Sequence, residues 1–99
     1  MIQTTLITVG TTRYDELLNE INKEEFFHSL MKLGCRNLII QYGNSILPNT
    51  FPKDKYILEN GETLNITTYK FKFDNQKEHG FRKDMMKSDL IISHAGIYI

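Results

Sequence analysis

Four short runs rich in apolar and β-branched side chains recur along the chain, at residues 4–9, 37–42, 65–71 and 89–93. Runs of this length and composition are typical of strands in a parallel sheet, which are buried on both faces. The segments after the first and third runs carry helical spacing instead. The pattern therefore predicts four strands joined by helical crossovers.

The first crossover is predicted to be a helix in two pieces. Asp15 can cap the first piece, and Asn22 has the position of a second N-cap, with Glu25 three residues on as its capping-box partner. Gly34 then occupies the usual place just past a helix end. The helix of the second crossover is expected from Asp74 to about Lys87, and its inward-facing residues are expected to be Phe81 and Met85.

The pair Asn60-Gly61 lies between two β-prone runs, and both residues tolerate positive φ, so it predicts a small hairpin. Alternation of strands and helices gives a parallel sheet with right-handed crossovers. The sequence thus predicts an α/β fold: a Rossmann-like parallel sheet in the order 3-2-1-4, with flanking helices and a small hairpin insertion. Residues 1–99 are expected to form a single domain.

The composition argues against several classes of protein: nucleic-acid-binding, disulfide-bonded, secreted and membrane-spanning proteins. Twelve basic residues balance twelve acidic ones, so nothing favours nucleic acid. The single cysteine, Cys35, excludes an internal disulfide and is expected to be a buried, inert thiol. The start lacks the features of a signal peptide, and no apolar run approaches the roughly 20 residues that cross a bilayer. We expect a cytosolic chain that needs a partner for any membrane role.

Two of the predicted strands end in small, polar, glycine-containing loops. Gly10-Thr11-Thr12 follows the first strand and offers hydroxyls and amide N–H groups to a phosphate. Ser93-His94-Ala95-Gly96 follows the last, where an imidazole donor can bind a diphosphate and the small residues leave room for it. His28 and His79 have no such setting. The absence of a His-x-x-x-His pair, a CxxC motif and a Walker lysine argues against metal or P-loop chemistry.

Three segments, taken in order, resemble a known family. They are Ile7 to Leu18 with its Val-Gly-Thr-Thr motif, Leu38 to Gly43, and Ser88 to Gly96 with its Ile-Ser-His-Ala-Gly motif. They are similar to the cytosolic catalytic subunit of the two-subunit UDP-N-acetylglucosamine transferase of the dolichol pathway. That family resembles the C-terminal, donor-binding half of GT-B glycosyltransferases of the family 28 type. The resemblance covers about Ile2 to Gly96 and is weakest in the hairpin region.

The resemblance implies a specific reaction. N-acetylglucosamine would pass from UDP-GlcNAc to dolichyl-diphosphate-GlcNAc, the second step of lipid-linked oligosaccharide assembly for N-glycosylation. The displacement would be inverting, with no cofactor or metal, and positive helix ends and loop amides would stabilise the departing UDP. A membrane-anchored partner subunit would hold the acceptor and recruit the chain to the cytosolic face of the endoplasmic reticulum. The implied donor-binding residues are Gly10, Thr11, Thr12, Gly43, His94, Ala95 and Gly96; no catalytic residue is assigned.

The chain departs from the family pattern at two places. Gly43-Asn44-Ser45 replaces a Gly-Arg-Gly-like turn, and Ile97-Tyr98-Ile99 stands where the family continues with a Gly-Ser pair, a glutamate and further βα units. We therefore expect a truncated or shortened domain that alone shows no measurable transfer and at most weak UDP-GlcNAc binding. One alternative is a non-catalytic module that only binds the membrane partner. Another, a flavodoxin-like regulatory domain, needs acidic residues after the strands, whereas Asp89 precedes its strand.

Overall fold

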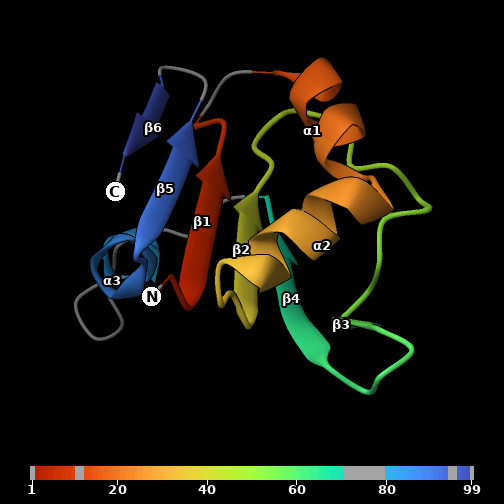
Figure 1. Ribbon diagram of the computed structural model, residues 1–99. Helices are drawn as coiled ribbons and strands as arrows, with labels where there is room; N and C mark the ends of the chain where they lie inside the picture. Colours follow the sequence, from red (N-terminus) through yellow and green to blue (C-terminus); the bar gives the residue numbers. More distant parts are fainter. Residues whose placement is uncertain (1, 11–12, 71–79, 94–95, 99) are drawn as a thin grey trace.

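The computed structural model describes residues 2–10, 13–70, 80–93 and 96–98 (Figure 1). Within these residues the chain forms helices and strands that alternate in the predicted manner. In chain order they are β1 (Thr4–Thr8), α1 (Asp15–Ile21), α2 (Glu24–Lys32), β2 (Asn37–Gln41), β3 (Lys55–Ile57), β4 (Thr63–Tyr69), α3 (Gly80–Lys87), β5 (Leu90–Ser93) and β6 (Gly96–Tyr98).

The strands form one sheet in the order β3-β4-β2-β1-β5-β6. Its four central strands are parallel, since β1 lies between β2 and β5, and β2 also pairs with β4. These are the four strands predicted from the apolar runs, in the predicted 3-2-1-4 order. The alternation of strand and helix was therefore sufficient to predict the centre of the sheet.

The sheet as a whole is mixed, which corrects the expectation of a wholly parallel one. β3 and β4 form the predicted antiparallel hairpin around Asn60-Gly61, but β3 joins the main sheet as an edge strand. At the other edge β6 pairs antiparallel with β5, with Gly96 opposite Ser93. The open side of β5 offers unpaired backbone groups, and residues 96–98 satisfy them. The short apolar end of the chain thus continues the sheet.

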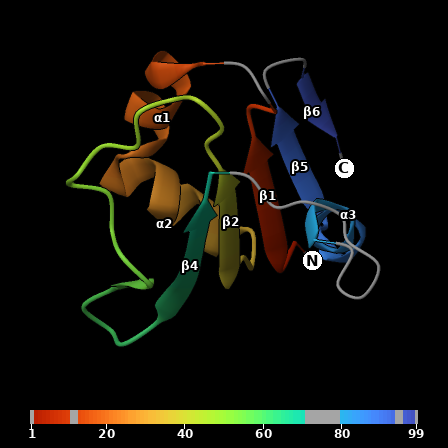
Figure 2. The same cartoon turned by 180° about the vertical axis from the view of Figure 1, so that it is seen from behind.

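The two crossovers place helices on opposite faces of the sheet (Figures 1 and 2). The step from β1 to β2 moves one way across the sheet, and the step from β4 to β5 moves the other way. Because both crossovers are right-handed, α1 and α2 cover one face and α3 the other. The sheet therefore forms the middle layer, and its four parallel strands have their carboxyl ends at the edge that lies uppermost in Figure 1.

The main core lies between the sheet and the α1–α2 pair. Phe27 of α2 is its aromatic centre, with ring centroids 5.7 Å from Phe51 and 4.9 Å from Tyr56. Cys35 is fully buried beside it, and its Sγ donates to the carbonyl of Asn37 at 3.3 Å, which confirms the predicted buried thiol. The remaining buried members are aliphatic residues of the helices and strands: Ile7, Leu18, Ile21, Leu30, Met31, Leu38, Ile40, Leu64, Ile66 and Leu90.

The first crossover breaks where predicted, but its caps differ. Asp15 is the first residue of α1 rather than its cap, and Lys23 precedes α2 without a side-chain capping bond. Asn22 donates its amide to Thr50 Oγ1 at 2.8 Å instead of capping α2. A tertiary partner has therefore replaced the local one. Gly34 follows α2 with a φ of 96°, the left-handed conformation that the sequence predicted for it.

Helix α3 is rotated about its axis relative to the prediction, so that a different residue faces the sheet. Met85 is 42% exposed, so the prediction that it faces inward is wrong, and the side chain of Phe81 and the predicted start at Asp74 lie outside what the structure describes. Asp84 is buried instead, and its Oδ2 accepts a hydrogen bond of 2.9 Å from the Tyr69 hydroxyl. Lys87 Nζ lies 3.6 Å from Asp84 Oδ1. The polar partner on β4 makes burial of this carboxylate possible.

Candidate functional site

The carboxyl ends of the parallel strands meet at one edge of the sheet. Thr8 is opposite both Gln41 and Ser93, and Gln41 is opposite Tyr69, so the last residues of β1, β2, β4 and β5 form one row. In open α/β sheets, ligands bind beyond this edge, where crossovers diverge from adjacent strands. Here they diverge between β1 and β5. The two loops predicted to bind a phosphate follow these neighbouring strands.

Gly10 opens the first of these loops with a φ of 63°, a backbone conformation that residues other than glycine rarely adopt. A Cβ built on it would meet nothing within 4 Å, so the space above the glycine is open. A ligand can approach the backbone here. Thr11 and Thr12, which the sequence placed beside it, lie outside the described residues.

The peptide groups of Gly10 are turned toward the protein. Its N–H donates to Gln41 Oε1 at 2.9 Å and to Thr8 Oγ1 at 3.2 Å, and its carbonyl accepts from Gln41 Nε2 at 2.8 Å. This N–H is therefore already satisfied, so Gly10 is not one of the loop amides that the sequence predicted to be available to a phosphate. The glycine contributes shape and space.

Gln41, at the end of β2, is the central side chain of this edge and was not predicted as a site residue. It is 4% exposed. Its Oε1 accepts from the Thr8 hydroxyl and the Gly10 N–H, and its Nε2 donates to the carbonyls of Gly10 and Lys70, each at 2.8 Å. All four hydrogen-bonding positions of the amide are thus used.

Gly43 follows β2 and forms the turn that the sequence placed at the ligand side. It is buried, its φ is 56°, and its N–H donates to the Lys70 carbonyl at 3.1 Å. The same carbonyl accepts from Gln41 Nε2. The ends of β2 and β4 are therefore tied together at this point, and any direct contact of Gly43 with a donor stays a prediction.

The far side of the first loop is held by the loop after β2. Ser45 is buried, and its Oγ accepts from the Tyr14 N–H at 2.6 Å. Asp15 Oδ1 accepts from the Ile46 N–H at 2.8 Å, and Asp15 Oδ2 pairs with Arg13 at the same distance. The pKa of Asp15 is lowered, chiefly by the Ile46 N–H and then by Arg13. The loop that starts at Gly10 is thus anchored on both sides to β2 and the residues after it.

The last predicted segment is described only in part. Gly96 is the first residue of β6, opposite Ser93 at the end of β5, while His94 and Ala95 lie outside the described residues. The structure places Gly10 and Gly96 beyond neighbouring parallel strands, at the same edge. The prediction that the two strand ends adjoin is confirmed, and the roles of the individual loop residues stay predictions. His28 lies elsewhere, on α2, where its Nε2 is 3.2 Å from the Tyr56 hydroxyl.

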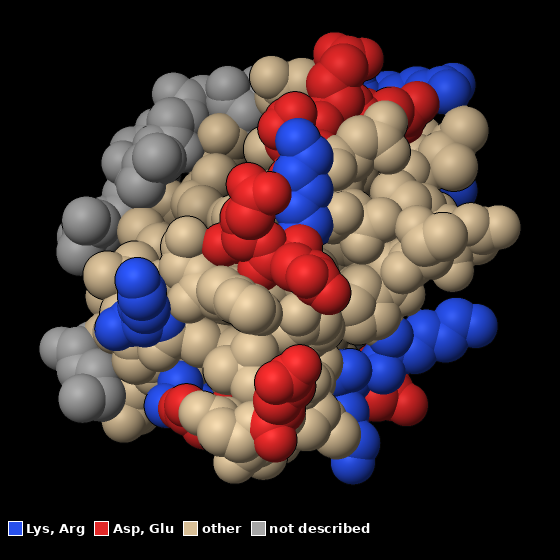
Figure 3. Space-filling view, turned by 45° about the vertical axis from the view of Figure 1, so that its right-hand side comes forward, with Lys and Arg blue, Asp and Glu red and all other residues tan. Residues whose placement is uncertain are grey.

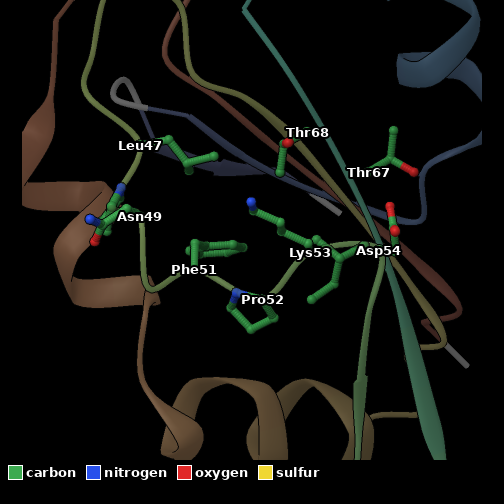
Figure 4. Close-up of a pocket in the computed structure, with 10 residues that line it drawn as sticks. Leu47, Asn49, Phe51, Pro52, Lys53, Asp54, Thr67 and Thr68 are labelled. Carbon is green, nitrogen blue, oxygen red and sulfur yellow. The ribbon is translucent and has the colours of Figure 1, made fainter.

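A hollow lies between β4 and the segment that leads to β3 (Figure 4). Its volume is about 470 Å³. Phe51 and Pro52 give it an apolar side, and Lys53 extends beside them (Figure 4). The other lining residues are Leu47, Pro48, Asn49, Asp54, Ile66, Thr67 and Thr68. Of the residues predicted to bind the donor, those that the structure describes, Gly10, Gly43 and Gly96, do not line this hollow.

The described part of the face covered by α1 and α2 shows no cluster of basic side chains that would indicate an anion site. Figure 3 shows acidic and basic side chains interleaved there, with acidic ones frequent over α1 and α2. Lys23 is paired with Glu20 at 3.0 Å and Arg13 with Asp15. Among the residues that the structure describes, no group of three or more His, Cys, Asp or Glu side chains could hold a metal ion.

The sequence over nearly the whole chain identifies the family. The model of the glycosyltransferase family 28 C-terminal domain matches residues 4–97, and the chain belongs to this family. No solved structure matches the chain. None of the helices that the structure describes has the length and apolar character required to span a membrane.

Curated relatives carry one common name, UDP-N-acetylglucosamine transferase subunit ALG13. The human and mouse proteins are each 34% identical over 91 residues, which is 91% of this chain and 7% of theirs. The Cryptococcus neoformans protein is 27% identical over 108 residues, or 94% of this chain and 54% of its own length. The chain thus spans about half of the fungal relative and a small part of the mammalian ones.

Proposed function

We propose that this chain is the donor-binding domain of a UDP-N-acetylglucosamine transferase subunit acting in the dolichol pathway. The observation that carries the proposal is the family match over nearly all of a chain whose parallel strands end in a row beneath an open glycine loop. A nucleotide sugar laid across this edge would reach the loops of β1 and β5 together. The names of the relatives supply the donor and the reaction.

In the proposed reaction, the bond between the sugar's anomeric carbon and the UDP oxygen breaks as an acceptor hydroxyl attacks from the opposite face. The charge that develops on the departing diphosphate is the feature that this domain would stabilise. We propose that the donor contacts Gly10, Thr11, Thr12, Gly43, His94, Ala95 and Gly96. The acceptor, dolichyl-diphosphate-GlcNAc, would be held by a membrane-anchored partner subunit at the cytosolic face of the endoplasmic reticulum.

The first test is a titration of the chain with UDP-GlcNAc, followed by NMR of the backbone amides. Shifts confined to Gly10, Gly43, Gly96 and their neighbours support the donor site. Shifts centred on the hollow beside Phe51, or no shifts at millimolar donor, contradict it. Because NMR detects weak complexes, this readout suits a domain for which low affinity is expected.

The second test is transfer of radiolabelled N-acetylglucosamine to the lipid acceptor. We expect no transfer by the chain alone and measurable transfer when the membrane subunit is supplied. Assembly with that subunit without transfer would favour the alternative, a module that only binds the partner. Transfer by the chain alone would contradict the two-subunit proposal.

A further inference from the structure

Gln41 uses its whole hydrogen-bonding capacity on residues at the carboxyl edge of the sheet, where the proposed donor site lies. The side chain is 4% exposed and lies at the end of a strand whose buried neighbours are apolar. Burial of an amide is costly unless its partners are present, and here each of the four positions has one. Two of these bonds reach the N–H and the carbonyl of Gly10. No other described side chain contacts both groups of this residue.

We propose that Gln41 is the positioning residue of the donor-binding loop. By holding both peptide groups of Gly10, it fixes the left-handed turn in which the loop leaves β1. The nucleotide sugar would then meet Gly10 already in its binding conformation, and less of the binding free energy would be spent on ordering this residue. The inference rests on the proposed function, because it assigns Gln41 an effect on donor affinity.

The geometry explains why a glutamine is required. Oε1 faces two donors, the Thr8 hydroxyl and the Gly10 N–H, and Nε2 faces two carbonyls. A carboxylate would keep the first pair but would turn an anion toward the carbonyls of Gly10 and Lys70. An apolar side chain of similar length would lose all four bonds. Gln41→Glu and Gln41→Met therefore remove different parts of the same network.

The Lys70 carbonyl extends this network to a third strand end. It accepts from Gln41 Nε2 at 2.8 Å and from the Gly43 N–H at 3.1 Å. Gln41 thus fixes Gly10 relative to the ends of both β2 and β4. The anchor on the far side of the loop, between Ser45 and Tyr14, does not touch Gly10, so it cannot replace this role.

The first measurement needs no ligand. Hydrogen exchange of the Gly10 amide, followed by NMR in the full chain, reports whether Gln41 holds this peptide. We expect exchange to accelerate about tenfold in Gln41→Met, the effect of one lost hydrogen bond, and less in Gln41→Glu, which keeps an acceptor. The matched control is Asp89→Ala, which removes two backbone bonds at the opposite edge of the sheet. It should leave Gly10 exchange unchanged relative to the other amides.

The second measurement is the affinity for UDP-GlcNAc of the same variants. We expect binding to weaken about tenfold in Gln41→Met and to stay within about twofold in Asp89→Ala, even where both are equally destabilised. Unchanged Gly10 exchange, or equal loss of affinity in both variants, overturns the role of Gln41. If the unmodified chain binds no donor, the proposed function fails instead. Should Gln41→Met not fold, the comparison of Gln41→Glu with Asp89→Ala decides the question.

Discussion

Replacement of Gly10 by alanine tests two effects that can be measured separately: the loss of stability from backbone strain and the loss of affinity for the donor. The glycine has a φ of 63°, and the left-handed region costs an L-residue about 1–2 kcal/mol. A Cβ would meet nothing within 4 Å, so no clash adds to this. Alanine also lowers the entropy of the unfolded chain, which returns about 0.4–1 kcal/mol. The expected net loss of stability is about 1 kcal/mol.

The matched control is Gly61→Ala in the β3–β4 hairpin. Gly61 has a φ of 91° and equally open space around its Cβ position, but it lies beyond the other edge of the sheet. Both variants should therefore lose similar stability, which for a domain of this size corresponds to a fall in Tm of about 4–8 °C. Only the Gly10 variant places a methyl group where the donor is proposed to approach.

The assay combines denaturant unfolding with UDP-GlcNAc titration by NMR. We expect Gly10→Ala to weaken donor binding at least about tenfold, as a methyl group that intrudes on a fitted contact costs more than 1.4 kcal/mol. Gly61→Ala should bind as the unmodified chain does. Equal affinity of the two variants would refute the placement of the donor over Gly10. A much larger stability loss in one of them would refute the strain argument.

Three further predictions concern the core, the amino-terminal edge and the second loop anchor. Phe27→Ala should lower the free energy of unfolding by about 3–5 kcal/mol, because the side chain is only 2% exposed. Met86→Ala is the control: this side chain is 81% exposed, so its loss should change the free energy of unfolding by less than about 0.5 kcal/mol. Urea unfolding measures both values. The backbone N–H groups of Gln3 and then Thr4 lower the pKa of Asp89. The ionised carboxylate therefore stabilises the fold above about pH 4, and this stabilisation is lost as the pH falls through the folded-state pKa. When Tm is measured from pH 6 to pH 2, Asp89→Ala should show a smaller fall in Tm toward low pH than the unmodified chain. Ser45→Ala should cost about 1 kcal/mol, measured in the same unfolding assay, because it leaves a part-buried backbone N–H without its acceptor.

The parts of the fold that depend on residues close together in the sequence were predictable from the sequence. The four central strands follow from apolar runs, the Asn60-Gly61 hairpin from two residues that tolerate positive φ, and the end of α2 from Gly34. The caps of the first crossover were not predictable, because Asn22 bonds to Thr50 rather than to its own helix. β6 was missed for a similar reason, since its place depends on the exposed edge of β5.

The candidate site divides in the same way. The glycine loops carry a local sequence signal, and the parallel pairing of the neighbouring strands β1 and β5 places Gly10 and Gly96 at one edge. Gln41 carries no such signal, because its partners lie 29 to 33 positions away and most of them are backbone atoms. A polar residue at the end of a buried apolar strand is the one clue, and it indicates only that some partner must exist.

Side chains of two different neighbours hold the central strand β1 at its two ends. Asp89, just before β5, accepts from the N–H groups of Gln3 and Thr4 at the amino end, and Gln41 of β2 holds Gly10 at the carboxyl end. The parallel ladders to β2 and β5 run between these points. The position of the donor-facing loop should therefore depend on β2 and its loop, and changes near Asp89 should act on stability alone. Loss of donor affinity should therefore follow changes at the carboxyl end of β1 and not loss of stability alone, which makes the proposed site testable one strand end at a time.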